Sequence, residues 1–328
     1  MTTTATKGKA SAPAKIILFG EHFVVYGNPA ILASINRRIT VSARKGKEGK
    51  VTIRSDIAAG EFEGSTFRLI EGANARATLE PIYFAARQVL VSRKQPAGTG
   101  LEIEMSSDIP YGVGLGSSAA ALVATIAAVE ELLGKTDRKK ICESAIEAER
   151  IIHKNSSGAD CYVSTYGGMI FYSRGEGYKK VESKSDLFMV IGNTGIKHNT
   201  GELVSSVRRL KEANQMAFQG LMAQSKDICN QALNALNSGN VDHLGMLMNE
   251  NQLLLERLGV THEKADELID IARSSGALGA KITGAGGGGA IIALAASKQD
   301  SERVAAGIKA AGYSAFEIEI DSKGLVVN

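Results

Sequence analysis

A glycine-rich stretch directly before an apolar helical pattern is the part of this sequence best suited to chemistry. It spans residues 109–121 and contains IPYGVGLGSSAAA. Glycine adopts positive φ angles without a steric penalty and lets a backbone approach an anion, and free N–H groups at a helix start favour negative charge. The pattern predicts a cradle for nucleotide phosphates made by Pro110, Tyr111, Gly112, Val113, Gly114, Leu115, Gly116, Ser117, Ser118, Ala119 and Ala120.

The spacing of this stretch differs from that of the common Walker A phosphate loop. A Walker A loop places a lysine next to its closing Ser or Thr, whereas Ser117 and Ser118 are followed by Ala119 and Ala120. Taken alone, the segment is also compatible with an ordinary helix start capped by serine. A cation for the phosphates therefore has to come from another part of the chain.

Two further segments favour the phosphate cradle over the ordinary helix start. Residues 12–27, APAKIILFGEHFVVYG, hold a short apolar run with Lys15 at its entry and Glu21 and His22 at its exit. A strand there would deliver polar groups into a cleft. Residues 281–290, KITGAGGGGA, predict a bare-backbone loop followed by an apolar strand, which close approach to a ligand explains best.

These three segments, in this order, resemble the signature motifs of the GHMP small-molecule kinases. Residues 149–160, ERIIHKNSSGAD, resemble the segment of that family's mevalonate kinase branch that carries a magnesium glutamate and the catalytic aspartate. Residues 193–200, NTGIKHNT, resemble the stretch that ends in a threonine near the substrate. The resemblance covers most of the chain and implies ATP-dependent phosphorylation of (R)-mevalonate on its 5-hydroxyl, giving 5-phosphomevalonate for isoprenoid synthesis.

The resemblance also implies roles for individual residues. Asp160 matches the catalytic aspartate that accepts the substrate hydroxyl proton, and Lys15 matches the lysine that contacts it and favours the developing alkoxide. Ser118 and Glu149 match the groups that hold Mg²⁺, an ion that prefers such oxygen ligands. The acceptor alcohol is expected to contact Glu21, His22, Thr200 and Ala285.

Simpler structural roles stay open for several of these side chains. At helical spacing Glu149 could lie on a solvated face, and Asp160 could cap a helix after residues 157–158. His22 could be a structural histidine. The chain also departs from the family's usual Asn-Pro-Ser-Gly before the aspartate, because Ser156 stands where proline is usual.

Three rival functions share parts of this pattern. A sibling kinase, such as phosphomevalonate kinase or a mevalonate 3-kinase, would need extra cationic groups or a shifted aspartate. A non-catalytic GHMP-fold binding protein would be indicated by loss of the lysine or the acids, and Lys15, Glu149 and Asp160 are all present. The GEH and SSGAD segments disfavour a diphosphomevalonate decarboxylase.

Length and composition limit the class of protein. A chain of 328 residues exceeds the usual single core, so two domains with a ligand cleft between them are expected. With 44% hydrophobic and 22% charged residues and no long apolar run, a cytoplasmic enzyme without a membrane span is predicted. A net charge of +3 and 5% aromatic residues argue against nucleic-acid binding.

The scattered Cys142, Cys161 and Cys229 predict small buried side chains, although a reactive thiol at Cys161 is an alternative.

Strands and helices are expected in both halves of the chain. Short β-branched segments dominate residues 15–106, and helical periodicity appears near residues 76–90, 117–133 and 138–153. The first ten residues predict a frayed end, and residues 173–186 predict a loop that separates a domain of residues 1–185 from one of residues 186–328. The resemblance implies an α+β fold with an amino-terminal domain like ribosomal protein S5 domain 2, a ferredoxin-like carboxy-terminal domain and a homodimer.

Overall fold

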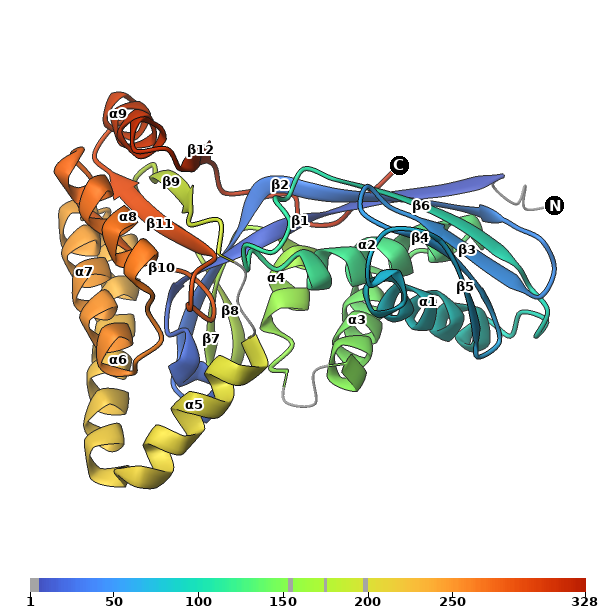
Figure 1. Ribbon diagram of the computed structural model, residues 1–328, viewed down its shortest axis with the longest axis horizontal. Helices are drawn as coiled ribbons and strands as arrows, with labels where there is room; N and C mark the ends of the chain where they lie inside the picture. Colours follow the sequence, from blue (N-terminus) through green and yellow to red (C-terminus); the bar gives the residue numbers. More distant parts are fainter. Residues whose placement is uncertain (1–5, 153–155, 174–175, 197–199) are drawn as a thin grey trace.

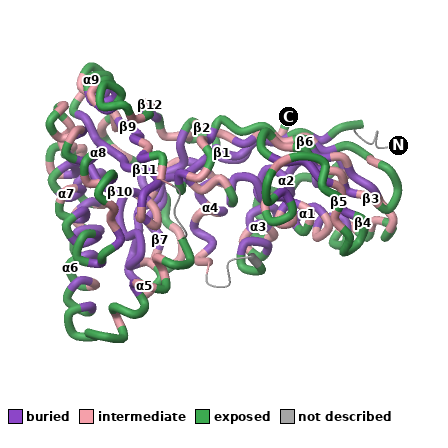
Figure 2. Tube along the Cα trace, viewed as in Figure 1, coloured by how far each residue is buried: buried purple, intermediate pink, exposed green. Residues whose placement is uncertain are grey.

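Two β-sheets lined by helices lie at opposite ends of an elongated molecule (Figure 1). The computed structural model describes residues 6–152, 156–173, 176–196 and 200–328. Within these residues the first sheet has nine strands and the second has four. Buried residues follow the inner faces of both sheets and the helix that packs at the centre of the first sheet (Figure 2).

The first sheet is organised by two long antiparallel strands, β1 (Lys7–Phe19) and β2 (Ala30–Lys45). Its strand order is β13-β1-β2-β6-β3-β4-β5, with β7 paired to β2 and β8 paired to β7. Only the β3 and β6 pair is parallel among the described strands. The remaining members are β3 (Lys50–Arg54), β4 (Ala59–Glu63), β5 (Thr66–Glu71), β6 (Leu101–Ser107), β7 (Met169–Ser173), β8 (Gly177–Val181) and β13 (Val326–Val327).

The helices of the first unit lie on one side of this sheet (Figure 1). They are α1 (Ala75–Ser92), α2 (Ser117–Leu132), α3 (Arg138–Ile152) and α4 (Ala159–Tyr166). Helix α2 is alanine-rich and buried on nearly all sides, which is typical of a helix inside a core. It lies so close to β1 that a methyl group on Gly8 would be 2.0 Å from the carbonyl oxygen of Ala128. This packing brings the start of α2 next to the middle of β1.

The second sheet is entirely antiparallel, in the order β10-β11-β9-β12. Its strands are β9 (Phe188–Asn193), β10 (Gly279–Ile282), β11 (Ala290–Ala295) and β12 (Ser314–Ile318). The helices of this unit are α5 (Thr200–Ala213), α6 (Gln215–Ser238), α7 (Val241–Arg257), α8 (Glu263–Ser274) and α9 (Lys298–Ala310), and a short 3₁₀ helix η1 (His22–Tyr26) follows β1. None of the helices in the described ranges has the length and apolarity needed to cross a bilayer.

The chain passes from the first sheet to the second between Val181 and Phe188. The predicted boundary between residues 185 and 186 falls in this crossing segment. The carboxy-terminal strand β13 returns to pair with β1, so the last residues of the chain contribute to the first sheet rather than to the second.

Two predictions about local structure are wrong. The expected loop of residues 173–186 contains strand β8, which forms a hairpin with β7 and exposes Lys179 and Lys180 as an edge strand commonly does. The expected frayed end of residues 1–10 includes the beginning of β1, which pairs with residues 41–44 of β2. Both misses concern strands whose partners, rather than their own residue patterns, make them ordered.

Candidate active site

Strand β1 contacts both glycine-rich segments predicted to share its site. The backbone N–H of Lys15 donates to the carbonyl oxygen of Leu115 in the expected phosphate cradle, at 2.9 Å. Further along β1, the hydroxyl of Thr283 donates to the carbonyl oxygen of Ile17 at 3.1 Å and accepts from its N–H at 2.9 Å. Three segments distant in sequence therefore meet in one place.

The expected cradle has the backbone geometry that a phosphate site requires. Gly112, Gly114 and Gly116 have φ angles of +77°, +78° and +73°, in the left-handed region that favours glycine. Gly116 caps α2 without a side chain, so no side-chain acceptor satisfies the first N–H groups of this helix. A methyl group on Gly284 would lie 3.3 Å from the carbonyl oxygen of Gly114, so the third motif faces the cradle.

Lys15 and Asp160 form an ion pair beside this helix start. Their nearest side-chain atoms, Nζ and Oδ2, are 3.0 Å apart. The lysine side chain is 6% exposed and the aspartate 31%, so the pair is buried on one side and open on the other. Gly116 makes room for it, because a methyl group there would lie 2.5 Å from Cγ of Lys15. Asp160 is in the first turn of α4, and the residue that caps this helix is Gly158 rather than the aspartate.

Glu149 of α3 is buried next to this pair. Burial, followed by the charge of Asp160, raises the pKa of the Glu149 carboxyl to about 7. The Ser156 hydroxyl donates to the Glu149 carboxylate. The alternative in which Glu149 lies on a solvated helix face is therefore wrong. Two carboxylates with one lysine leave a local excess of negative charge when both are ionised, which suits a divalent cation.

Glu21 does not lie where the sequence predicted. Its side chain has no exposed surface and is paired with Lys281 of β10, while Asn251 of α7 donates to its other oxygen at 3.0 Å. The predicted direct contact between Glu21 and an acceptor is therefore wrong, because a carboxylate enclosed by these two partners has no face toward a ligand.

Two of the other predicted acceptor residues, His22 and Ala285, meet at the glycine-rich loop of residues 284–289. Nε2 of His22 donates to the carbonyl oxygen of Ala285 at 2.8 Å, and burial lowers the pKa of this imidazole. Thr200 is the exposed first residue of α5. The same helix reaches the loop, since a methyl group on Gly287 would lie 2.8 Å from Cδ1 of Leu203. Residues 197–199, before Thr200, lie outside the described residues.

A cavity of about 710 Å³ opens beside the start of α2. Apolar side chains from β2, α1 and the cradle segment supply much of its wall, among them Ile39, Leu79, Ile82 and Ile109. Polar groups at its edge include Asp56, Asn74, Ser117 and Ser118. The cavity therefore combines an apolar wall with the helix end that favours anions.

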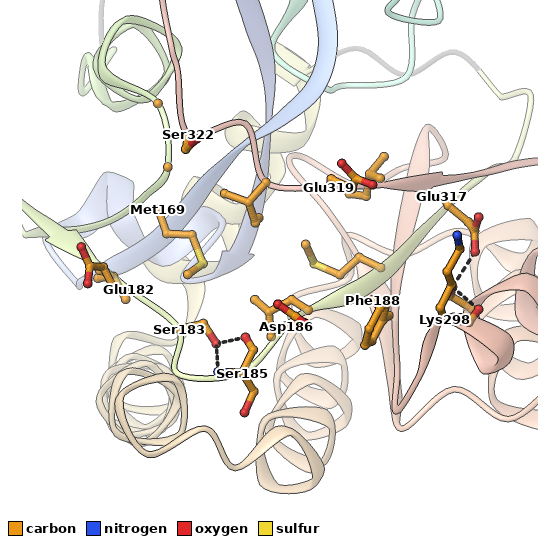
Figure 3. Close-up of a pocket in the computed structure, with 18 of the residues that line it drawn as sticks. Met169, Glu182, Ser183, Ser185, Asp186, Phe188, Lys298, Glu317, Glu319 and Ser322 are labelled. Carbon is orange, nitrogen blue, oxygen red and sulfur yellow. Dashed lines mark hydrogen bonds between the residues drawn. The ribbon is translucent and has the colours of Figure 1, made fainter.

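A different cavity, of about 690 Å³, lies where the chain crosses between the two sheets (Figure 3). Its walls come from the crossing segment before β9, from β7 and from the segment after β12, and they include Met169, Asp186, Phe188 and Glu319. None of the predicted site residues lines this cavity.

Comparison with known proteins agrees with the arrangement of the three motifs. The model of the GHMP kinases N terminal domain matches residues 81–168, and that of the GHMP kinases C terminal region matches residues 232–314. A mevalonate kinase of Pyrococcus furiosus is 40% identical over 97% of both chains. One of Aeropyrum pernix is 33% identical over 96% of this chain and 97% of the relative.

The chain belongs to the GHMP kinase family. Among solved structures, L. major mevalonate kinase in complex with R-mevalonate superposes with a TM-score of 0.83 at 29% identity, covering 97% of this chain and 98% of the other. Lactococcus lactis galactokinase shares the fold alone, with a TM-score of 0.78 at 22% identity, covering 99% of this chain and 95% of the other. The predicted two-domain α+β fold of the GHMP kinases is confirmed, and membership of this family implies use of ATP.

Two residues that border this GHMP kinase site, Lys281 and Asn251, lie outside the predicted set. Lys281 interrupts an otherwise apolar strand pattern, which is a usable signal of a buried partner, whereas Asn251 lies in a run of polar residues, 249–252, and carries no such signal. The walls of the cavity beside α2 carry no comparable signal, because they come from elements far apart in sequence. All three cysteines are buried and unpaired, as predicted, and burial raises the pKa of the Cys161 thiol.

Proposed function

We propose that this GHMP kinase transfers the γ-phosphoryl group of ATP to the 5-hydroxyl of (R)-mevalonate. The ion pair of Lys15 and Asp160 beside a glycine cradle is the observation that carries the proposal. The full-length similarity to mevalonate kinases supports the choice of acceptor.

The nucleotide is assigned to the cradle and the neighbouring cavity. The triphosphate would accept hydrogen bonds from the first N–H groups of α2 and from the backbone around Gly112 and Gly114. The purine would occupy the cavity of about 710 Å³, whose apolar wall suits a flat aromatic ring. The phosphates would then lie between this cavity and the carboxylate of Asp160.

The residues present fit a Mg²⁺ ion. Ser118 is exposed in the first turn of α2, and the buried Glu149 carboxylate lies near the Asp160 charge. A hydroxyl and a carboxylate are the few protein ligands that Mg²⁺ takes when phosphates complete its coordination. The ion would supply charge neutralisation at the transferred group.

The chemistry then depends on the open side of the ion pair. Asp160 accepts the proton of the acceptor hydroxyl, while the Lys15 ammonium, 3.0 Å away, stabilises negative charge on the attacking oxygen. Much of the rate enhancement in phosphoryl transfer comes from positioning and charge stabilisation, so the fixed geometry of the pair matters as much as its proton affinity.

The acceptor is assigned to the side of the cleft formed by His22, Thr200 and the loop of Ala285. These groups offer an imidazole, a hydroxyl and backbone amides, which can hydrogen-bond the oxygens of a carboxylated diol. Glu21 contributes through His22 rather than by contact with the acceptor. A cytoplasmic homodimer belongs to the same proposal, and light scattering of the purified protein would test its oligomeric state.

Product analysis tests the proposal directly. The purified protein is incubated with ATP, MgCl₂ and (R)-mevalonate, and the product is examined by ³¹P and ¹³C NMR. The expected product carries phosphate on the 5-oxygen and forms in step with ADP. Phosphate on the 3-oxygen, or phosphorylation of phosphomevalonate in preference to mevalonate, would overturn the assignment of the acceptor.

A further inference from the structure

A second lysine and carboxylate pair lies outside the contacts that the proposed reaction uses. Lys281 is in β10 of the second sheet, and Glu21 lies between β1 and η1. Both side chains are 0% exposed, although their residues come from opposite units of the molecule. The pair therefore joins the first motif, residues 12–27, to the third motif, residues 281–290, across the interface between the units.

Both charged groups of this pair have further hydrogen-bond partners in the surrounding elements. The Lys281 ammonium donates to Glu21 and to the carbonyl oxygen of Ile282, the latter at 2.8 Å. Asn251 donates to the second Glu21 oxygen at 3.0 Å, and the neighbouring Gln252 accepts from the N–H of Ile282 at 3.0 Å. Helix α7, strand β10 and the end of β1 thus share one buried polar network.

Stability alone does not explain such a network. Removing two charges from water costs free energy that their attraction often fails to repay, and an apolar pair of similar volume is frequently as stable. The buried side-chain oxygen of Asn251 also has no partner in the described part of the chain, which is a further cost. The feature that the network does provide is a unique alignment of the elements it joins.

The elements aligned in this way are those that form the acceptor side of the cleft. Glu21 directly precedes His22, which donates to Ala285, and Lys281 stands two residues before Thr283, which is bonded to Ile17. Each residue of the buried pair therefore lies within two residues of a contact that connects the first motif with the third.

We propose that Lys281 is a positioning residue, which through Glu21 holds His22 against the loop of residues 284–289 and so shapes the acceptor half of the site. The inference rests on the proposed function for the identity of the acceptor. The ATP half of the cleft has its own connection to β1, between Lys15 and Leu115, and does not depend on this network.

The test uses the paired variant Glu21→Gln with Lys281→Met, which removes both charges and leaves none unpaired. We expect this variant to melt close to the wild-type temperature. Its KM for mevalonate should rise about tenfold, while its KM for ATP changes by less than about twofold, because only the acceptor half loses its alignment. A crystal structure of the variant should show that Nε2 of His22 no longer contacts the carbonyl oxygen of Ala285.

The matched control is Arg93→Met with Glu130→Gln, which removes a pair joining the C-cap residue of α1 to α2. This control should leave both KM values unchanged. A paired Glu21 and Lys281 variant with wild-type KM values and an intact contact between His22 and Ala285 would overturn the inference. If the wild-type protein fails to phosphorylate mevalonate, the proposed function fails instead, and the crystallographic contact still decides the positioning role.

Discussion

The two lysine and carboxylate pairs of this kinase differ in one respect that separates chemistry from architecture. Lys15 with Asp160 keeps 31% of the aspartate side chain exposed, whereas Lys281 with Glu21 has no exposed surface at all. Both pairs join elements that are far apart in sequence. The open pair can therefore act on a ligand, and the sealed pair can act only on the protein around it.

The comparison also explains why glycine is found beside one pair and polar side chains beside the other. The open pair is bordered by Gly116, which leaves room for the lysine stem. The sealed pair is bordered by Asn251, which satisfies one carboxylate oxygen that water cannot reach. Burial thus decides which neighbours each pair requires.

Replacing the aspartate of the open pair should have the largest effect. Asp160→Asn should lower kcat by about 10²–10⁴-fold, because the amide cannot accept the hydroxyl proton. Its melting temperature should stay near that of the wild type. Steady-state kinetics with (R)-mevalonate and ATP measures the loss, and Glu147→Gln, an exposed acid two residues from Glu149, is the control that should keep full activity.

Breaking the sealed pair on one side should mainly reduce stability. Lys281→Met leaves the Glu21 carboxylate buried without its cation and should lower the free energy of unfolding by about 3–5 kcal/mol. Urea denaturation followed by circular dichroism measures this loss. Adding Glu21→Gln to the same chain should restore most of it, and the absence of any recovery would contradict the idea that the unpaired charge is the cause.

Placing a methyl group beside the open pair should separate the effect of backbone strain from the effect of displacing Lys15. Gly116→Ala and Gly134→Ala both place a methyl group at positive φ, at +73° and +76°, which costs about 1–2 kcal/mol. Only the first methyl group meets Lys15, whereas nothing lies within 4 Å of the second. We expect Gly116→Ala to lose more stability than Gly134→Ala, because the Lys15 side chain must also shift, and kcat/KM to fall about 10²-fold in Gly116→Ala alone.

The smallest expected effect is on the pH dependence of stability, at His22, the histidine next to the sealed pair. Burial lowers the pKa of His22, so the unfolded chain binds a proton at this residue below about pH 6.5 while the folded protein resists it. This contribution to stability is present above that pH and is lost as pH falls through the folded-state pKa. Thermal melts between pH 7.5 and 5.5 should show a shallower acid decline for His22→Gln, and an unchanged slope would count against the buried neutral ring.

Local patterns in the chain were enough to locate most of the elements around the site. The cradle and the strand that carries Lys15 each have a pattern confined to one short segment, so turn chemistry and periodicity predict them. Strand β8 and the beginning of β1 were missed because their order comes from partners distant in the chain. The catalytic, metal-binding and acceptor-binding roles stay predictions for Lys15, Asp160, Ser118, Glu149, His22, Thr200 and Ala285.

The sequence by itself located three glycine-bearing segments, a lysine and an aspartate, since residue types and their order are properties of the chain. The resemblance of these segments to GHMP kinase motifs then implied phosphoryl transfer. Only the tertiary structure decided which acid is open and which is enclosed. Glu21 and Asp160 are both carboxylates close to motif glycines, yet Glu21 is enclosed by β10 and α7, whereas Asp160 keeps 31% of its side chain exposed. The physical reason is that exposure depends on the elements packed around a side chain, and those elements lie far from it in sequence.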